Sequence, residues 1–323
     1  MKRLLHIAAG ACLALTATVA LAQGYPQRPI TLLVGYTPGG PVDTTARVFA
    51  RYLGDKIGQS VVVENRAGAS GMIAADATSK AKPDGYMLNF AASPSLTISP
   101  LVQRTTLFDP KTDFTPIGLV VDYTNVLLVG PDFPGKTVAD LVAYAKNNPD
   151  AVAFGSAGVG ASNHLSGELL KKTTGAPMLH VPYRGNSPAM MDVMSGKITF
   201  MFDITSTAKN FVDGGKARAL AVTSRERNPG FPDVPTMIEA GIADFDVTGW
   251  YAVVGPKGLP EDVRAKLTEA MLRVSEDPEF RQAMERGGYS LHKPDGKALQ
   301  QRIERDYALW KDVIESANIS ADN

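Results

Sequence analysis

Short apolar runs alternate with longer stretches of helical periodicity along most of the chain. The runs are rich in β-branched residues and have the length of strands. We expect strands at residues 30–34, 60–64, 87–91, 124–129, 152–154, 198–202, 219–223 and 251–254. Helical patterns lie between them at residues 41–53, 137–147, 164–173 and 188–194. This alternation predicts an α/β fold with largely parallel sheets.

The C-terminal part of the chain is mostly helical. Apolar side chains recur there in two stripes at helical spacing: Val263, Leu267, Met271 and Val274, then Leu299, Ile303, Tyr307, Trp310 and Ile314. Such spacing places the side chains on one face of a helix. We therefore expect both stripes to pack on the core rather than to line a ligand site.

The length and the apolar pattern together predict two α/β lobes around a ligand cleft. Two long apolar runs, residues 117–130 and 247–255, are the candidates to carry the chain between lobes. We expect lobe one to comprise residues 23–122 and 247–323, and lobe two to be an insertion of residues 123–246. The two segments where the chain passes from one lobe to the other form a hinge, and the cleft beside a hinge is a natural ligand site.

The N-terminus has the pattern of a secretory signal peptide. Lys2 and Arg3 precede an uncharged apolar stretch that closes with Ala20-Leu21-Ala22, a small-x-small cleavage pattern. We expect residues 1–22 to be removed and the mature protein to be periplasmic. A membrane anchor is the alternative, because the stretch approaches the ~20 residues that span a bilayer. A lipidated Cys12 is disfavoured by its early position in the stretch.

Composition excludes several classes of protein. Cys12 is the only cysteine and lies in the predicted signal peptide, so we expect no disulfide, no thiol nucleophile and no thiolate metal site. Removing Lys2 and Arg3 from 33 basic residues leaves 31 against 33 acidic residues, a formal charge of −2. No basic run stands out, so we expect no nucleic-acid partner. We also expect no cofactor and a monomer.

Residues 37–44 form a loop suited to an anion. The loop contains Thr37, Gly39, Gly40 and Asp43, and it lies between an expected strand and an expected helix. Paired glycines let a ligand approach the main chain, and free N–H groups at a helix N-terminus favour a negative charge. An ordinary strand-to-helix turn is the alternative interpretation.

Residues 154–164 form a second loop of this kind. Ser156, Gly158, Ser162 and His164 lie where a strand-like run ends and a helical pattern begins. Ser162 or Asn163 alone is more typical of a simple helix cap. Two such loops on opposite predicted lobes favour the interpretation that they clamp one anion between them.

Other candidate pocket residues follow the carboxyl ends of expected strands, where open α/β sheets bind ligands. Ser93 follows the strand at 87–91, Arg184 leads into the helix at 188–194, and Asp203 follows the strand at 198–202. Tyr36 and Phe90 are candidates for flat apolar contacts, although such residues are more typical of core packing, and only Tyr36 is about equally typical of both roles.

No pattern of catalytic residues is complete. Residues 154–158 read Phe-Gly-Ser-Ala-Gly, so the first glycine of a nucleophile elbow is replaced by Phe154. The glycine spacing at residues 155–160 is reversed relative to a dinucleotide-binding loop. His164 and Glu168 are one helical turn apart but lack a third metal ligand at a recognisable spacing. We therefore expect a binding protein rather than an enzyme.

An ordered set of short motifs resembles one family. In chain order, the motifs lie at residues 25–30, 38–40, 46–47, 58–59, 62–66, 83–86, 154–156, 164–165, 180–185, 188–189, 202–203, 218–223, 233–236 and 250–251. The set resembles the Bug family, the TctC-like substrate-binding component of tripartite tricarboxylate transporters. Each motif alone is weak, whereas the order and content of the set are specific. The resemblance runs from about Tyr25 to the C-terminus.

The resemblance implies a type II periplasmic-binding-protein fold that closes on a small carboxylate, such as a di- or tricarboxylate or an aromatic carboxylate. It implies that the membrane subunits of a tripartite transporter are the partner. It assigns carboxylate binding to residues 37–44 and 155–164, with Asp203 opposite and Arg184 nearby. Tyr36 stands where the family commonly has Phe, and with Phe90 it suggests an aromatic ligand such as terephthalate. A periplasmic sensor that feeds a two-component receptor is the rival function, because it uses the same closure.

Overall fold

The computed structural model describes residues 24–103, 107–243 and 245–317. The predicted signal peptide, residues 1–22, lies outside the described residues. Within the described part of the chain, no helix combines the length and the apolar character that crossing a bilayer requires.

The first half of the molecule is built on strands in the order β2-β1-β3-β9-β4. Strands β1, β2 and β3 are parallel, whereas β9 is antiparallel to both β3 and β4. The strands are β1 (Ile30–Val34), β2 (Val61–Asn65), β3 (Met87–Ala92), β4 (Phe114–Val129), β9 (Thr248–Pro256) and the short β10 (Ser290–Leu291), which pairs with β4. The helices of this half are α2 (Pro41–Ile57), the 3-10 turn η1 (Ala69–Gly71), α3 (Met72–Ser79), α4 (Ser93–Thr97), α5 (Ser99–Val102), α10 (Glu261–Glu276), α11 (Pro278–Arg286) and α12 (Gly296–Ala317).

The second half is built on strands in the order β4-β7-β5-β6, with β8 also paired to β4. Strands β5, β6 and β7 are parallel, and β4 is antiparallel to β7 and β8. The strands are β5 (Ala153–Ser156), β6 (Leu179–Pro182), β7 (Phe200–Ile204) and β8 (Arg218–Val222). The helices are α6 (Val138–Asn147), α7 (Ser162–Thr174), α8 (Asn186–Met194) and α9 (Thr205–Asp213).

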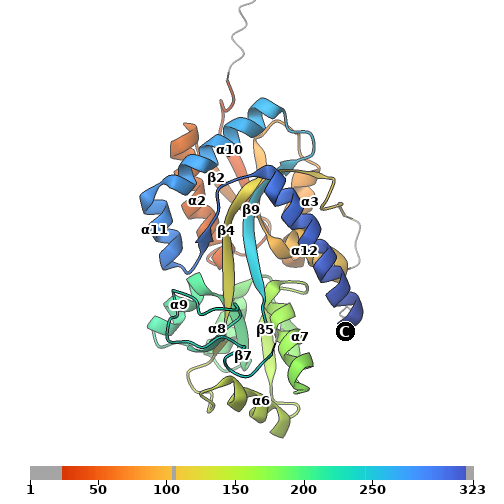
Figure 1. The fold of residues 1–323 in the computed structure, drawn as a ribbon, viewed down its shortest axis with the longest axis vertical. Helices are drawn as coiled ribbons and strands as arrows, with labels where there is room; N and C mark the ends of the chain where they lie inside the picture. The colour runs from red at the N-terminus through yellow and green to blue at the C-terminus, as the bar shows by residue number, and fades with distance from the viewer. Residues whose placement is uncertain (1–23, 104–106, 244, 318–323) are drawn as a thin grey trace, which may run out of the picture.

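Strand β4 joins the two halves. It pairs with β9 as far as Thr124 and with β7 from Asn125 onward, and Figure 1 shows it running from the upper half into the lower half. The boundary predicted at residues 122 and 123 falls inside β4, and the boundary at 246 and 247 falls just before β9. We propose these boundaries as the limits of lobe one and lobe two, and the two names are used in that sense below.

Local sequence explains where several of the helices begin and end. Pro41 occupies the first turn of α2, where its missing N–H costs no hydrogen bond, and Gly58 ends this helix with a left-handed φ of 76°. Thr137 and Asp140 form a capping box at the start of α6. Asp277 caps α11 by accepting hydrogen bonds from the amides of Glu279 and Phe280.

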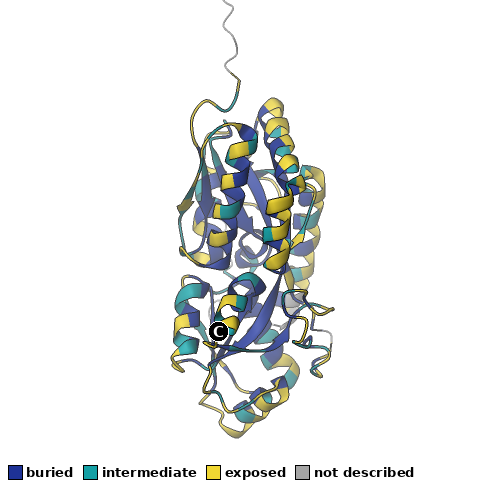
Figure 2. Cartoon of the chain, turned by 90° about the vertical axis from the view of Figure 1, so that its left-hand side faces the viewer, coloured by how far each residue is buried: buried dark blue, intermediate teal, exposed yellow. Residues whose placement is uncertain are grey.

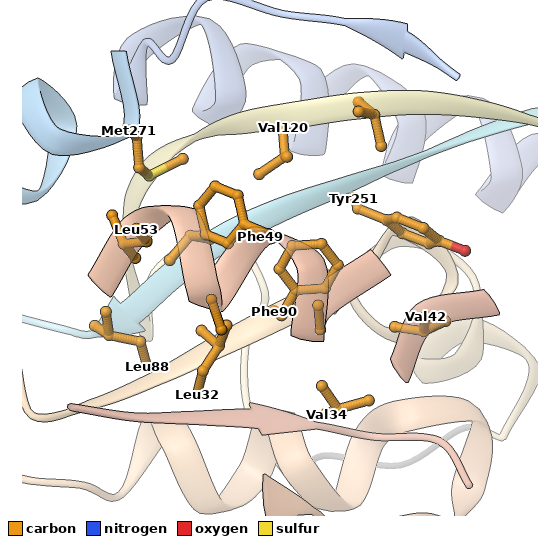
Figure 3. Close-up of a cluster of buried hydrophobic side chains, with 14 of the residues drawn as sticks. Leu32, Val34, Val42, Phe49, Leu53, Leu88, Phe90, Val120, Tyr251 and Met271 are labelled. Carbon is orange, nitrogen blue, oxygen red and sulfur yellow. The ribbon is translucent and has the colours of Figure 1, made fainter. Parts of the chain in front are cut away.

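Each lobe has its own apolar core, and Figure 2 shows buried strands beneath helices whose outer faces are exposed. In lobe one, Phe49, Phe90 and Tyr251 pack together with ring centroids 5.5 to 5.6 Å apart, as Figure 3 shows. In lobe two, Phe154 and Phe200 stack at 5.4 Å. The stripes expected in the C-terminal helices are buried at Val263, Leu267, Met271 and Val274 in α10 and at Leu299, Ile303 and Ile314 in α12.

Strands β4 and β6 differ most from the sequence expectation, and the two-residue strand β10 was not expected either. The strand expected at residues 124–129 is only the end of β4, which begins at Phe114. Register shifts between Pro116 and Gly118, and between Leu119 and Val121, interrupt the alternation that would have revealed it. Strand β6 was not expected, because its four residues are only half-buried or exposed and carry no apolar pattern.

Candidate functional site

The two lobes meet directly along one side of the cleft. The Ser70 hydroxyl donates a hydrogen bond of 2.7 Å to the carbonyl of Val159, and the Gln103 amide donates one of 3.2 Å to the same carbonyl. The Ser99 hydroxyl donates to the carbonyl of Gly160 at 3.3 Å. These contacts join η1 and α5 of lobe one to the loop before α7 of lobe two. The structure is therefore in a closed conformation.

A second set of contacts closes the other side. The turn after α11 reaches lobe two, where the Thr205 hydroxyl donates to the carbonyl of Gly287 at 3.0 Å. The Asn228 side chain donates to the carbonyl of Gly288 at 3.1 Å. The next residue, Tyr289, also contacts lobe two, because its hydroxyl lies 2.5 Å from the Ser206 hydroxyl. These polar contacts lie outside the cavity described next, so closure is stabilised partly by the protein alone.

A small cavity of about 10 Å³ lies between the lobes, about the space of one water molecule. Lobe one lines it with Tyr36, Val42, Ala92 and Pro94. Lobe two lines it with residues from β4, the loop before α7, the first turns of α7 and α8, and the end of β7. Among the described residues that line this cavity, no side chain is charged. Only main-chain and neutral side-chain groups can contact a ligand there.

The polar side chains of lobe two at the cavity come from three elements. Tyr123 lies in β4, Ser162 and Asn163 lie at the N-terminus of α7, and Asn186 opens α8. The Tyr123 hydroxyl lies 3.5 Å from the Ser162 hydroxyl. The first turn of α7 presents N–H groups that the helix itself does not satisfy, which favours a bound anion. The sequence prediction included Ser162 and placed it correctly at the start of this helix.

The loop of residues 37–44 reaches the cavity through Val42, and Tyr36 just before the loop also lines it, but Asp43 is not among the lining residues. Asp43 is 2% exposed, and its carboxylate accepts hydrogen bonds from the amide of Gly39 (2.9 Å), from Arg47 Nε (3.0 Å) and from Asn65 Nδ2 (2.8 Å). Burial opposes ionisation, but these hydrogen bonds outweigh it and hold the pKa of Asp43 below its usual value. Asp43 therefore fixes the loop, and the Gly39 amide is already engaged.

Two further members of this loop have distinct surroundings. The amide of Gly40 makes a long hydrogen bond of 3.4 Å to the carbonyl of Thr37. The Thr37 hydroxyl is buried and has no hydrogen-bond partner among the described residues. Across the cleft from it lies Gly185, where a Cβ would clash with that hydroxyl. Thr37 is thus a free polar group at the contact between the lobes.

In the second loop, Ser156 and His164 support the backbone from behind. The Ser156 hydroxyl donates to the carbonyl of Gly158 at 3.1 Å and lies 2.6 Å from His180 Nε2. His164 Nδ1 accepts a hydrogen bond of 3.1 Å from the amide of Gly160, and its ring stacks on His180 with centroids 4.1 Å apart. Neither Ser156 nor His164 lines the cavity.

Both histidines are held neutral. Burial, followed by the charges of His180 and Lys171, lowers the pKa of His164 to about 3. Burial and Lys171 lower the pKa of His180 to about 4. Although a serine beside a histidine suggests a nucleophile and base, Ser156 does not line the cavity, and its hydroxyl bonds the carbonyl of Gly158. The pair is better explained as support for the loop.

Gly158 allows the closest approach of this loop to lobe one. Its φ is 128°, a region that favours glycine, and a Cβ there would lie 2.8 Å from the Ser70 hydroxyl. The glycine expected to bind the ligand therefore has a steric role at the contact between the lobes.

The remaining predicted residues fall in different places. Phe90 is 1% exposed in the core of lobe one and does not line the cavity. The Ser93 hydroxyl accepts a hydrogen bond of 3.2 Å from the amide of Trp250. Arg184 is exposed and is not among the lining residues. The fourth of these predicted residues, Asp203, does not line the cavity either, but it accepts a hydrogen bond from Asn186, which does.

Asp203 is buried directly behind Asn186. Its carboxylate accepts hydrogen bonds from Asn186 Nδ2, from the amide of Ile204 (2.9 Å) and from the Thr207 hydroxyl (2.7 Å). Burial, the dominant cause, raises the pKa of Asp203 to about 6 despite these hydrogen bonds. Asp203 thus positions Asn186 at the cavity and has no free oxygen for a cationic ligand.

Sequence reasoning missed Tyr123, Asn163 and Asn186 as lining residues. Asn186 lies two residues after Arg184, which was the residue predicted from this part of the chain. Tyr123 precedes the strand that was expected to begin at residue 124. Asn163 was interpreted as a helix cap, and its Oδ1 does accept a hydrogen bond of 3.0 Å from the amide of Ala157.

The chain is similar to known proteins along most of its length. The model of the TctC family, described as "Tripartite tricarboxylate transporter family receptor", matches residues 45–319. A protein encoded in the tcbD-tcbE intergenic region of Pseudomonas sp. (strain P51) is 34% identical over 98% of this chain and 95% of its own length. Protein BugT of Bordetella pertussis is 38% identical over 73% of each chain.

Solved structures show the same architecture. The periplasmic binding protein BugD superposes with a TM-score of 0.88 at 34% identity, over 92% of this chain and 99% of its own. Rpa4515 of R. palustris, solved with adipate, gives a TM-score of 0.89 at 33% identity over the same shares of the two chains. MatC of Rhodopseudomonas palustris, solved with malate, gives 0.85 at 30% identity, over 90% of this chain and 100% of its own. The mixed α/β fold with two lobes that was expected from the sequence is thereby confirmed.

Proposed function

This chain belongs to the TctC family of tripartite tricarboxylate transporter receptors, and from that premise we propose that it captures a small dicarboxylate in the periplasm for a tripartite transporter. The observation that carries the proposal is the uncharged polar cavity between two closed lobes. Neutral donors and a helix N-terminus suit an anion that is held without a salt bridge. Ligand binding then favours the closed conformation, because the ligand contacts lobe one and lobe two at the same time only when the lobes are closed.

The N-terminus of α7 is the main anchor that we propose for a carboxylate. The helix has 13 residues, and its first residue, Ser162, lines the cavity beside Asn163. Tyr36 and Tyr123 also line the cavity, and the Tyr36 hydroxyl donates a hydrogen bond of 2.8 Å to the carbonyl of Ser70. A cavity of about 10 Å³ is too small for a dicarboxylate, so the loops must separate to admit one.

Two relatives suggest the class of ligand. Rpa4515 was solved with adipate and MatC with malate, both linear dicarboxylates. A ligand of this class can place one carboxylate at α7 and the other toward residues 36–40 of lobe one. An aromatic carboxylate such as terephthalate is the second candidate, and the two tyrosine rings that line the cavity favour it. Phe90, which suggested it first, packs in the core instead.

Isothermal titration calorimetry on protein freed of bound solutes by unfolding and refolding tests the proposal. We expect a linear dicarboxylate (succinate, malate or adipate) to bind with a micromolar or lower Kd, and benzoate and citrate to bind at least tenfold more weakly. Tighter binding of terephthalate would favour the second candidate. Absence of binding by every carboxylate in the panel would contradict the proposed function.

Export and delivery are tested separately. If residues 1–22 are a signal peptide, mass spectrometry of the periplasmic fraction should find a mature chain that begins at Gln23. Cells that lack this protein should lose high-affinity uptake of the ligand and regain it when the gene is restored. Normal uptake, combined with a lost transcriptional response to the ligand, would favour a sensor. We also propose that the ligand is released unchanged, which NMR of the bound and recovered ligand can check.

A further inference from the structure

Asn125 carries a side chain that the described structure leaves without a partner. The residue is 0% exposed, and neither its Oδ1 nor its Nδ2 makes a hydrogen bond to any described residue. Its backbone is satisfied, because its amide donates to the Thr223 hydroxyl at 3.1 Å and its carbonyl accepts from the amide of Thr223 at 2.9 Å. Buried polar side chains are nearly always hydrogen-bonded, so an unpartnered amide in the core points to a missing partner.

The strand register places this side chain at the cavity. Asn125 follows Tyr123 by two residues in β4, so both side chains face the same side of the sheet. Directly across the ladder, Asn125 pairs with Ile204 of β7 in antiparallel register, which puts these two side chains next to each other on one face. Tyr123 and Ile204 both line the cavity. The Asn125 amide therefore lies next to two residues that line the cavity, although Asn125 itself is not one of the lining residues.

Two other hydroxyls are also buried without a partner in the described chain, those of Thr37 and Tyr251. The Tyr251 ring lies 4.7 Å from the Tyr123 ring, and Figure 3 shows its hydroxyl pointing away from the phenyl ring of Phe90. Thr37 is adjacent in sequence to Tyr36, which lines the cavity.

The chemistry of an amide restricts what can satisfy it. Asn125 donates through Nδ2 and accepts through Oδ1. A carboxylate only accepts, so it would leave Oδ1 buried and unpaired, which is unfavourable. A hydroxyl next to a carboxylate supplies the missing donor. An ammonium group would also donate, but both carboxylates near the cavity, Asp43 and Asp203, are fully engaged in hydrogen bonds to the protein.

We infer that Asn125 is a specificity-determining residue that selects a hydroxy-dicarboxylate over the dicarboxylate that lacks the hydroxyl. This inference rests on the proposed function, because it assumes that a dicarboxylate occupies the cavity. The Asn125 amide donates to a carboxylate oxygen of the ligand and accepts a hydrogen bond from the ligand's hydroxyl. The inference goes beyond the ligand class that the cavity lining alone supports.

Calorimetry with malate and succinate tests the inference, since the two ligands differ only by one hydroxyl. We expect the wild-type protein to bind malate about tenfold or more tightly than succinate, the effect of one buried hydrogen bond. In Asn125→Leu, which replaces the amide by an apolar group of similar size, and in Asn125→Ala, the preference should fall to about twofold or less. Asn148→Ala, at an exposed asparagine after α6, should keep the wild-type preference. Aspartate should bind more weakly than malate to the wild-type protein.

The melting temperature of the ligand-free variants separates a recognition role from a structural one. If Asn125 recognises the ligand, Asn125→Leu should melt at or above the wild-type temperature, because it removes an unpaired polar group. A lower melting temperature with equal weakening of malate and succinate would overturn the inference in favour of a structural role. Equal binding of the two ligands by the wild-type protein would overturn the inference alone. Failure of every carboxylate to bind would overturn the proposed function as well.

Discussion

The Tyr289 hydroxyl of lobe one lies 2.5 Å from the Ser206 hydroxyl of lobe two, and it also bonds the Thr45 hydroxyl at 2.8 Å. Tyr289 is therefore a bridge between the lobes. The neighbouring carbonyls of Gly287 and Gly288 accept hydrogen bonds from lobe two as well. None of these residues lines the cavity. The free energy of closure thus has a contribution that is independent of the ligand, and substitutions can change it without touching the site.

Tyr289→Phe should weaken ligand binding although it makes no contact with the cavity. The substitution removes the hydroxyl but keeps the ring, which packs 5.9 Å from the ring of Tyr251. Loss of a net ~1 kcal/mol from the closed state predicts a roughly fivefold higher Kd by calorimetry. Tyr52→Phe is the matched control, because the Tyr52 hydroxyl bonds Glu279 within lobe one. An unchanged Kd in Tyr289→Phe would show that this bridge does not stabilise closure.

The two serines of the second loop should respond differently to substitution. Ser162→Ala removes a hydroxyl that lines the cavity, so it should raise the Kd by about three- to tenfold with little change in the free energy of unfolding. Ser156→Ala removes the hydroxyl that bonds His180 and Gly158, so it should lower the free energy of unfolding by about 1–2 kcal/mol. Urea denaturation and calorimetry on both variants measure the two effects. Equal changes in Kd and in the free energy of unfolding for the two variants would contradict a binding role for Ser162 and a structural role for Ser156.

Gly185→Ala should hold the lobes apart. A Cβ at this position would clash with the Thr37 hydroxyl across the cleft, whereas the rest of lobe two is unaffected. We expect ligand affinity to fall at least tenfold, and small-angle scattering in the presence of ligand to give a larger radius of gyration than for the wild-type protein. Gly196→Ala is the control, because it also strains a glycine but meets nothing within 4 Å. Wild-type affinity in Gly185→Ala would show that the Thr37 contact is not required for closure.

The positions of the two loops could be predicted from sequence because the signals are local. Glycines between a strand run and a helical pattern lie within a few residues of each other, and both loops do lie where the lobes meet. The partners within each loop could not be predicted. Whether the Gly39 amide is free depends on Asp43, whose orientation is fixed in turn by Asn65 on another strand. Such a network is set by tertiary packing rather than by spacing in the sequence.

The type of a residue did not predict whether it lines the cavity, because tertiary packing determines which side chains reach it. Arg184 was predicted near the cleft, but it is exposed, whereas the neutral Asn186 lines the cavity. Phe90 was chosen for its ring, but its neighbours Phe49 and Tyr251 come from distant parts of the chain and enclose it. Asn125 could not be singled out at all, because its significance lies in having no partner among the described residues, which only coordinates reveal.

Acidification should destabilise the fold through His164 and His180. Their pKa values in the folded protein, about 3 and about 4, lie below the usual value of 6.5. Above pH 6.5 neither the folded nor the unfolded chain protonates them. As the pH falls from 6.5 toward 4, these histidines bind protons in the unfolded chain but not in the folded chain. The free energy of unfolding therefore decreases. Asp203 makes the opposite contribution to stability on acidification. Its raised pKa of about 6 means that, as the pH falls, the folded chain binds this proton before the unfolded chain does.

The histidine contribution is therefore measured as a difference between variants. The variant His164→Asn/His180→Gln keeps polar groups near Gly160 and Ser156 but cannot be protonated. Between pH 7 and pH 5, urea denaturation should show that the wild-type protein loses roughly 1–2 kcal/mol more per histidine than this variant. His292→Gln, at a half-buried histidine of lobe one, should retain the wild-type loss. Equal losses in the wild-type protein and the double variant would mean that the stacked pair is not kept neutral by burial.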